Sequence, residues 1–246
     1  MSTVMISGAS RGIGKATALK FANLGYNVVV CYNDSKQQAE DLVNEIKKIS
    51  NAIAVKVDVS DYSQVDDAYN SAKKYFGNID VVVCNAGIAQ TAMYIDTTKQ
   101  DFDLLVGTNL AGVYNLSRVA LPDMVFRKKG AIVMTSSIWG LEGASMEALY
   151  SMTKHGVVGL AKSLALEYAD CGITVNAICP GMTDTDMVKG YSDEDMREIL
   201  ADIPSGRINT PQEVAESIVW LATNSHITGQ VLTINGGIGD LSIKLQ

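Results

Sequence analysis

The chain has 246 residues, of which 47% are hydrophobic, and it carries a net charge of −7. This length suits one α/β domain or two smaller domains, and the apolar content is enough to build a large buried core. Negative charge repels nucleic acid phosphates and anionic lipid, and no apolar run reaches the ~18 residues of a membrane helix, so we expect neither a nucleic acid nor a membrane partner.

Strand-like apolar runs alternate with helix-like segments along the whole chain. Runs such as 28–30 and 81–83 are apolar on consecutive residues, which indicates strands covered on both faces by helices. The last helix is expected to begin after Thr210, which forms a capping box with Glu213. We predict one α/β domain over residues 1–246, a Rossmann-type, doubly wound parallel sheet of seven strands. The expected strands are 3–7, 27–32, 52–57, 79–84, 131–136, 173–179 and 231–234, and the clearest helices are 36–49 and 62–76.

The polar segment 184–203 interrupts this alternation before the last helix. It lies between a strand end and a helix, where such sheets carry their substrate lids. We interpret it as a substrate loop that can move. An ordinary surface excursion is the alternative interpretation.

The first predicted strand leads into a glycine-rich turn, Ser7-Gly8-Ala9-Ser10-Arg11-Gly12-Ile13-Gly14. Gly8 allows the tight turn, while Gly12 and Gly14 allow close approach of the backbone to a pyrophosphate and of the helix to the strand. Three glycines can also make a simple turn. Their place after the first strand of an α/β chain favours a dinucleotide site instead, with Ser10, Arg11 and Ile13 among its contacts.

The end of the second strand bears on the choice between NAD and NADP. NAD enzymes place an acidic side chain there, against the 2′-hydroxyl of the ribose. Here Tyr32 takes that position, and Arg11 can offer its guanidinium to a 2′-phosphate. We therefore predict NADP(H), although Asp34, two residues further on, leaves NAD(H) open.

Tyr150 and Lys154 are four residues apart, so on a helix they share one face with Cβ atoms ~5–6 Å apart. A nearby ammonium lowers the pKa of a phenol from ~10, and such a phenol can protonate a forming alkoxide. Ser137 stands thirteen residues before Tyr150, at a strand end, where its hydroxyl can polarise a substrate oxygen. Reduction of a ketone is the reaction these three residues favour.

Taken together, these motifs resemble the short-chain dehydrogenase/reductase family, from about Val4 to Gly237. Ser7 stands where the family's glycine turn begins with Thr, and Cys84 replaces the first Asn of its N-N-A-G motif. Both departures lie outside the catalytic residues. The resemblance implies that the dinucleotide also contacts Tyr32, Asn33, Asp58, Val59, Asn85, Ala86, Gly87, Pro180, Gly181 and Thr183, with Tyr150 and Lys154.

The resemblance also implies four catalytic roles. Tyr150 is the general acid, Ser137 orients the carbonyl, and Lys154 binds the nicotinamide ribose and lowers the pKa of Tyr150. Asn109 matches the helix Asn that holds a water in a proton relay through Lys154. Its alternative role is a polar contact that stabilises the helix, and for Asn85 a structural role between strands is the preferred interpretation.

Within the family the chain is similar to bacterial 3-oxoacyl-[acyl-carrier-protein] reductases of fatty acid biosynthesis, over 172–176, 203–207 and 228–230. Segment 88–93 lacks residues usual in that enzyme. Segments 136–140 and 143–147 resemble the 5-aminopentanone reductases that act on modified elongation factor P, in which Glu147 would meet a substrate amine. We expect a 3-oxoacyl thioester substrate; an amino-ketone or another small carbonyl compound, including a hydroxysteroid type, is the alternative. The complete Ser137–Tyr150–Lys154 set argues against a dinucleotide-binding module without turnover, and the 238–246 tail matches neither group.

The remaining expectations concern surroundings and assembly. The start of the chain lacks a basic segment followed by an apolar one, which favours a cytoplasmic protein. Four cysteines without a C-x-x-C pair and only two histidines predict buried structural thiols and no metal site. Segments 101–126 and 149–168 are expected to be long helices rich in small apolar residues, so we predict a homotetramer, or a dimer, built by helix pairing.

Overall fold

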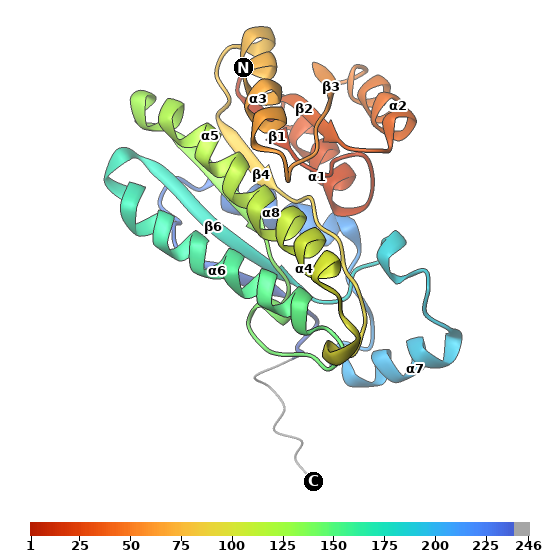
Figure 1. Cartoon of the computed structure of the whole chain (residues 1–246). Helices are drawn as coiled ribbons and strands as arrows, with labels where there is room; N and C mark the ends of the chain where they lie inside the picture. Colours follow the sequence, from red (N-terminus) through yellow and green to blue (C-terminus); the bar gives the residue numbers. More distant parts are fainter. Residues whose placement is uncertain (239–246) are drawn as a thin grey trace.

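The computed structural model describes residues 1–238, and within them it confirms the seven-stranded parallel sheet (Figure 1). The strand order is β3-β2-β1-β4-β5-β6-β7. The chain therefore starts in the middle of the sheet, winds to one edge, and returns to build the other half, so β1 and β4 flank the point where the winding reverses. The strands are β1 (Thr3–Ile6), β2 (Asn27–Tyr32), β3 (Ala52–Lys56), β4 (Val81–Cys84), β5 (Gly130–Thr135), β6 (Ile173–Pro180) and β7 (Val231–Ile234).

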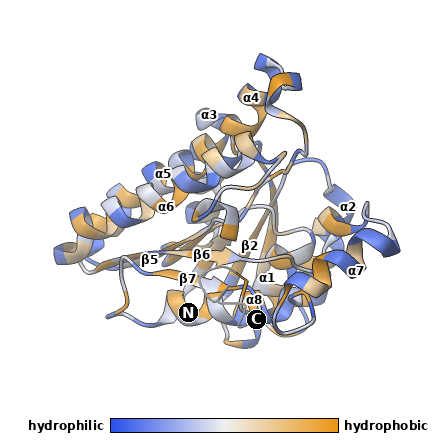
Figure 2. Cartoon of the chain, turned by 90° about the horizontal axis from the view of Figure 1, so that it is seen from below, coloured by the Kyte–Doolittle hydropathy of each residue, from blue (hydrophilic) through white to orange (hydrophobic). Residues whose placement is uncertain are grey.

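Helices cover both faces of this sheet, as the consecutive apolar residues predicted (Figure 2). Val29 and Val82 face one layer of helices, and Val28 and Val83 face the other. Burying a valine side chain stabilises the fold by roughly 1.5–3 kcal/mol, so these alternating pairs hold the sheet from both sides. The first layer is α3 (Tyr62–Phe76), α5 (Gly112–Arg127) and α6 (Ala148–Tyr168); the second is α1 (Gly12–Asn23), α2 (Lys36–Ile46) and α8 (Pro211–Thr223).

Side-chain caps set the beginnings of several helices. The capping box between Thr210 and Glu213 is present at the start of α8, as expected. Arg207 binds the same carboxylate through two nitrogens, at 2.6 and 2.9 Å. Its hydrogen bonds, with those of Thr210, lower the pKa of Glu213 to about 2. In contrast, the helix expected over 36–49 ends at Ile46.

The long helix expected over 101–126 is interrupted. α4 (Lys99–Val106) passes into a π-helical stretch, η2 (Gly107–Ala111), before α5 begins. A π-helical turn holds one more residue than an α-helical turn, and such turns are frequent at functional sites. Asn109 lies in the middle of η2 and is fully buried. The extra residue therefore falls at one of the predicted catalytic positions.

The 184–203 segment has more regular structure than expected. It contains the short helix η5 (Asp186–Val188) and the helix α7 (Asp193–Asp202), which begins with a capping box between Ser192 and Asp195. None of the residues of α7 is buried, and Figure 1 shows this helix standing away from the sheet. A β-bridge between Thr183 and Asn209 anchors the start of the segment.

The remaining short helices lie in connections: η1 (Tyr94–Asp96), η3 (Ile138–Gly140) and η4 (Ala169–Cys171). The 238–246 tail, apart from Ile238, lies outside the described residues. Over residues 1–238, every helix is too short or too polar to cross a membrane.

Candidate active site

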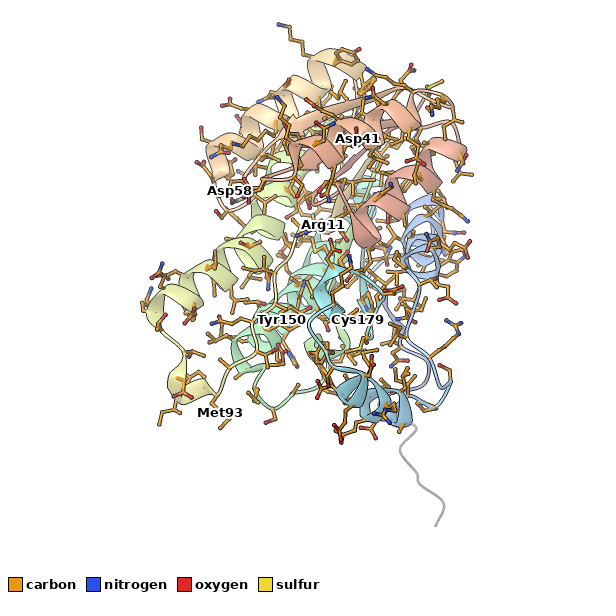
Figure 3. All side chains as sticks on the ribbon, turned by 90° about the vertical axis from the view of Figure 1, so that its right-hand side faces the viewer. Arg11, Asp41, Asp58, Met93, Tyr150 and Cys179 are labelled. Carbon is orange, nitrogen blue, oxygen red and sulfur yellow. The ribbon has the colours of Figure 1, made fainter. Side chains whose placement is uncertain are left out.

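The predicted site residues gather at the carboxyl-terminal edge of the sheet. β1 runs into the glycine turn, β4 ends before Asn85, and β5 ends before Ser136 and Ser137. Figure 3 shows Arg11, Asp58 and Tyr150 along one side of the molecule. The carboxyl ends of parallel strands form the edge at which α/β sheets bind their ligands, so the topology brings these segments together.

The glycine turn is so tight that its backbone leaves no space for a side chain at Gly8 or Gly14. Gly8 adopts a positive φ of 60°, and a Cβ added to Gly14 would lie 2.2 Å from the carbonyl oxygen of Gly8. α1 starts at Gly12 after Arg11, whose side chain makes no capping hydrogen bond. The first N–H groups of α1 therefore point out of a close backbone turn, an arrangement that fits a pyrophosphate.

Ser7 and Asn85 lock the end of β4 to this turn. The hydroxyl oxygen of Ser7 accepts hydrogen bonds from the backbone N–H groups of Asn85 and Ala86, at 2.9 and 3.0 Å. The Asn85 amide donates to the carbonyls of Ser7 and Gly8, at 3.0 and 3.2 Å. Asn85 thus has the structural role between strands that the sequence favoured.

The residues expected around the adenosine half lie after β2 and β3. Tyr32 is buried, and Asn33 is exposed and donates to Asp34 at 3.3 Å. Asp58 accepts hydrogen bonds from the N–H and hydroxyl of Ser60, at 2.9 and 2.7 Å. The carbonyl of buried Val59 accepts from the Asn115 amide at 2.8 Å. The segments that follow β2 and β3 are therefore held by these contacts, and the Asn33 side chain is exposed to solvent.

Arg11 has a partner that the sequence did not indicate. Its guanidinium contacts the carboxylate of Asp186 at 3.2 Å, and Lys189 approaches the same carboxylate at 2.5 Å. These cations lower the pKa of Asp186, with Lys189 contributing most. A cavity of about 520 Å³ opens here, between α1, α2 and the start of the 184–203 segment. The glycine turn and the expected substrate segment are thus joined by an exposed ion pair.

Ser137 and Tyr150 lie together at the end of β5. Ser137 caps η3 by accepting from the N–H of Trp139 at 3.2 Å, and Tyr150 lies in the first turn of α6. Burial raises the pKa of Tyr150 to about 12, although a hydrogen bond with the Ser137 side chain acts in the opposite direction. The phenol is therefore protonated at neutral pH.

Lys154 is almost completely buried beneath this pair. Its Nζ donates to the carbonyl of Thr135 at 3.0 Å and lies 5.5 Å from the centre of the Tyr150 ring. Burial lowers the pKa of Lys154 to about 8. The expected acidification of Tyr150 by Lys154 is not found, because the ammonium faces the ring and burial dominates the pKa of the phenol.

The Asn109 side chain is hydrogen-bonded to the backbone of the segment that follows β4. Its Oδ1 accepts from the N–H of Ile88 at 2.8 Å, and its Nδ2 donates to the carbonyl of the same residue at 2.9 Å. A Cβ on Gly87 would lie 3.3 Å from both Asn109 Oδ1 and Lys154 Nζ. The four predicted catalytic side chains therefore converge on one end of the sheet.

A family model described as enoyl-(acyl carrier protein) reductase matches residues 8–239. The 3-oxoacyl-[acyl-carrier-protein] reductase FabG of Staphylococcus aureus is 40% identical over 239 residues, which are 96% of this chain and 97% of the relative. The chain belongs to the short-chain dehydrogenase/reductase family. It is therefore an oxidoreductase, and the resemblance stated from its motifs is confirmed.

Two solved structures share the fold over almost the whole chain. A structure described as ElxO with NADP bound superposes with a TM-score of 0.89 at 36% identity, covering 96% of this chain and 98% of that one. A 3-oxoacyl-[acyl-carrier protein] reductase from Brucella melitensis gives 0.90 at 33% identity, covering 96% and 91%. The single-domain architecture of the family thus extends over nearly all of this chain.

The Pro180–Thr183 stretch starts at the last residue of β6. A Cβ added to Gly181 would lie 3.0 Å from the Cα of Asn235, so the chain passes very close to the end of β7. The hydroxyl of buried Thr183 donates to the carbonyl of Gly181 at 3.0 Å. These contacts fix the Pro180–Thr183 stretch at the edge where the motif comparison predicted it.

Glu147 lies one turn before Tyr150, and only one of its two carboxylate oxygens has a hydrogen-bond partner among residues 1–238. Its Oε1 accepts from the Thr91 hydroxyl at 2.9 Å, whereas its Oε2 is buried and has no hydrogen-bond partner among residues 1–238. Burial raises the pKa of this carboxyl. His155, by comparison, bonds through Nδ1 to the carbonyl of Ser151 at 2.9 Å.

Sequence reasoning missed two hydroxyl groups that support α6. Ser136 donates to the carbonyl of Lys154 at 2.8 Å, and Thr153 accepts from the Asn109 amide at 3.2 Å. Ser136 was visible beside Ser137 at the strand end. Thr153 had one available signal, its place directly before Lys154.

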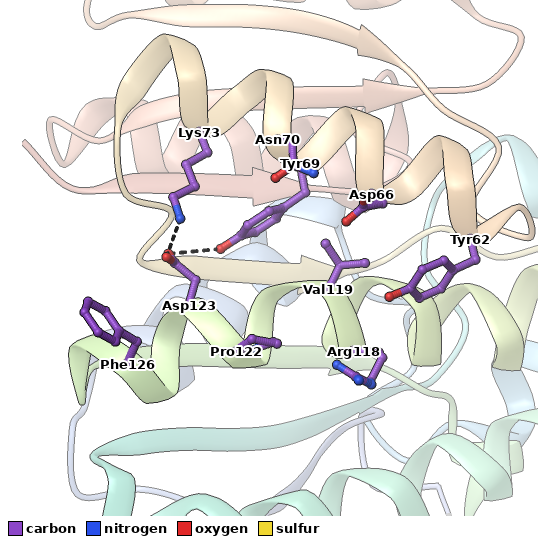
Figure 4. Close-up of a pocket in the computed structure, with 10 residues that line it drawn as sticks. All are labelled: Tyr62, Asp66, Tyr69, Asn70, Lys73, Arg118, Val119, Pro122, Asp123 and Phe126. Atoms are coloured by element: carbon purple, nitrogen blue, oxygen red, sulfur yellow. Dashed lines mark hydrogen bonds and ion pairs between the residues drawn. The ribbon is translucent and has the colours of Figure 1, made fainter.

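A second cavity, of about 410 Å³, lies between α3 and α5, away from the sheet edge (Figure 4). Its central carboxylate, Asp123, is bound by Lys73, by Tyr69 at 3.4 Å and by Arg127 at 3.3 Å. These groups satisfy one another and tie the two helices together. We therefore interpret this cavity as part of the helix packing.

Proposed function

We propose that this oxidoreductase uses NADPH to reduce the ketone of a 3-oxoacyl thioester to a secondary alcohol. The observation that carries the proposal is the convergence of Ser137, Tyr150 and Lys154 at the carboxyl edge of the sheet. The family model takes its description from enoyl reductases, but the Staphylococcus aureus and Brucella melitensis relatives are named as 3-oxoacyl reductases. Their names support the carbonyl group as the point of reduction.

The residues present fit a bound dinucleotide phosphate. The pyrophosphate would lie against the N–H groups that open α1, next to Gly8 and Gly14. Tyr32 stands where an NAD enzyme has its acid, and Arg11 lies within the turn, which together favour a 2′-phosphate. The remaining proposed contacts are Ser10, Gly12, Ile13, Asn33, Asp58, Val59, Asn85, Ala86, Gly87, Pro180, Gly181 and Thr183. When bound, NADPH supplies the hydride.

The chain's own side chains supply the proton and hold the ketone. Tyr150 carries a proton at neutral pH because its pKa is about 12, so its phenol can donate that proton to the carbonyl oxygen. Ser137 donates a hydrogen bond to the same oxygen and stabilises the charge that develops there. We propose that Lys154, with a pKa of about 8, replaces the proton through a water held near Asn109.

The direct test is Tyr150→Phe, which removes the acid and keeps the ring. We expect the variant still to bind NADPH, as measured by fluorescence titration. Its kcat on an acyl-thioester β-ketone should fall by a factor of about 10² to 10⁴, because the proton donor is lost. Full turnover by this variant would show that another group is the acid.

A second substrate class is favoured by Glu147. A buried carboxylate oxygen without a partner loses the hydrogen bonds that it makes in water, and a substrate ammonium group would restore them. Glu147 lies close enough to Tyr150 to raise the pKa of its phenol. An amino-ketone, such as a 5-aminopentanone group on a protein, would place its amine there while its carbonyl meets the tyrosine.

One experiment separates the two classes. Rates are compared for an acyl-thioester β-ketone, a small amino-ketone and a plain alicyclic ketone, each with NADPH and NADH. If the amine binds Glu147, then Glu147→Gln should lower kcat/KM for the amino-ketone by roughly tenfold or more, since a charge-assisted bond is lost. Glu142→Gln, an exposed neighbour, is the control. Equal loss on all three ketones would contradict amine recognition.

We also propose that the protein is a cytoplasmic homotetramer, with dimers as the alternative. Large apolar side chains are exposed on the two long helices, and they include Tyr114 and Phe126 on α5 and Met152 and Leu166 on α6. Covering them across a two-fold axis would remove this apolar surface from water. Light scattering tests the proposal, and a single peak at the monomer mass would contradict it.

A further inference from the structure

Thr153 lies between Tyr150 and Lys154 in sequence and is fully buried. Its hydroxyl makes two hydrogen bonds. Oγ1 donates to the carbonyl of Tyr150 at 2.7 Å and accepts from the Nδ2 of Asn109 at 3.2 Å. One hydroxyl therefore links the helix that carries the tyrosine to the π-helical stretch that carries the asparagine.

The direction of this hydrogen-bond chain is determined by the groups at its two ends. The N–H of Ile88 can only donate, so the atom of Asn109 that faces it must be Oδ1. Nδ2 then faces Thr153 and must donate to it. The hydroxyl proton of Thr153 is left for the carbonyl of Tyr150, which can only accept. The chain runs from Asn109 through Thr153 to Tyr150 in that order.

This chain of hydrogen bonds matters because it links the Asn109 side chain to α6. Asn109 lies in the π-helical stretch η2, and its other side-chain hydrogen bonds among residues 1–238 are both with the backbone of Ile88, four residues after the end of β4. Thr153 is the contact that ties its amide to α6. The Oδ1 of Asn109 and the Nζ of Lys154 both lie 3.3 Å from the position of a Cβ on Gly87. A rotation of the Asn109 amide would therefore change the surroundings of the Lys154 amine.

We propose that Thr153 is a positioning residue for proton delivery. Its hydroxyl orients Asn109 beside Lys154 and holds the first turn of α6, which carries Tyr150. This inference rests on the proposed function, in which Lys154 and Asn109 resupply the proton that Tyr150 donates. Without the hydroxyl, the amide of Asn109 loses an acceptor, and proton resupply slows while hydride transfer is unaffected.

The test compares three variants with wild type. Thr153→Val keeps the shape and removes the hydroxyl, and Thr153→Ser keeps the hydroxyl. Thr17→Val is the matched control, since the hydroxyl of buried Thr17 only donates to a helix carbonyl, that of Ile13, at 2.8 Å. Thermal unfolding verifies that each variant is folded, and Thr153→Ala replaces the valine variant if that one is not.

Isotope effects separate positioning from structural support. For Thr153→Val we expect kcat to fall roughly tenfold, with the KM for ketone and the NADPH affinity within twofold of wild type. The D2O solvent isotope effect on kcat should rise, and the effect of deuterated NADPH should fall, because proton delivery becomes slower than hydride transfer. Thr153→Ser should restore both isotope effects, and Thr17→Val should leave them unchanged.

Other results would overturn the proposal in recognisable ways. A valine variant with wild-type kcat, or with a lower kcat and unchanged isotope effects, would mean that Thr153 only supports the fold. The same fall in kcat in Thr153→Ser would show that the hydroxyl group is not responsible for the effect. If wild type reduces none of the three ketones, the proposed function itself fails, and this is decided before any variant is measured.

Discussion

The floor of the site and the segment that follows β6 are held by different forces. We call Asn85, Asn109, Ser136, Thr153 and Lys154 the site floor. Its side chains bond to backbone carbonyls and to one another, and all of them except Asn85 are buried. Leaving one such buried group without a partner costs ~1–3 kcal/mol.

Apart from the buried Ile203, the 184–203 segment is held mainly by weaker, exposed contacts. Asp186 pairs with Arg11 and Lys189 in solvent, and α7 has no buried residue between Asp193 and Asp202. Exposed ion pairs stabilise a fold by ~0.2–1 kcal/mol each. The comparison teaches that the groups that support the catalytic tyrosine are fixed, whereas the segment expected to contact the substrate can be rearranged at little cost.

The largest effect should come from Lys154→Met, in the site floor. We expect kcat to fall by about 10² to 10⁴, because the proton source behind Tyr150 is lost. The same change should remove an energetic cost. The pKa of Lys154 is about 8 in the folded chain, against 10.5 as the ordinary value, so folding disfavours its charged form.

The sign of this cost can be checked by pH. Below pH 8 both states carry the proton, and the full cost of about 3 kcal/mol is present. Between pH 8 and 10.5 the folded state has lost the proton that the unfolded state retains, so wild-type stability rises. Urea unfolding should show the gap between Lys154→Met and wild type shifting in favour of wild type over this range. A constant gap would contradict the buried ammonium.

Gly14→Ala should have the next largest effect, since it acts on the backbone below the dinucleotide. The added Cβ would lie 2.2 Å from the carbonyl oxygen of Gly8, so the turn must open. We expect a loss of ~1–3 kcal/mol in the free energy of unfolding and no measurable NADPH binding. Gly159→Ala, where a Cβ meets nothing within 4 Å, is the control and should gain up to ~1 kcal/mol. Normal NADPH titration of Gly14→Ala would show that the turn is looser than described.

We expect the smallest effect from a substitution in the 184–203 segment. Asp186→Asn removes the carboxylate that holds Arg11, at a stability cost below ~1 kcal/mol. Because Arg11 is then free for a 2′-phosphate, the Kd for NADPH should fall by about two- to fivefold, with the Kd for NADH unchanged. Asp193→Asn, on α7, is the comparison variant. If the Kd values for NADPH and NADH change by the same factor, Arg11 does not bind the 2′-phosphate.

The sheet and its edge followed from local patterns in the sequence. The bounds of β2, β7 and α3 agree with the expected ranges, because their apolar runs and caps are local signals. The placement of Ser137 and Asn85 at strand ends then follows from parallel topology alone. These features need no knowledge of which distant residues pack together.

Most of the unexpected features depend on contacts between distant segments. The π-helical stretch at Asn109 is stabilised by Ile88, twenty-one residues earlier, and Arg11 bonds to a residue 175 positions away. The pKa of Tyr150 is dominated by burial, which no spacing of Tyr and Lys reveals. α7 is the exception, because its Ser192–Asp195 capping box is a local sequence signal of the same kind as the Thr210–Glu213 box of α8.

The wide turn in η2 also sets how α4 and α5 face relative to each other. Each residue of an α-helix advances the chain by about 100° around the axis, so one additional residue rotates everything before it by that angle. Leu105 of α4 is buried while Leu104 is exposed. Deleting one residue from Gly107–Ala111 would turn α4 by more than a quarter of a revolution and bring a different side of it towards α6, the helix it packs against. The π-helical turn therefore sets the rotation of α4 relative to α5. Without it, the two helices could not both keep their present buried sides.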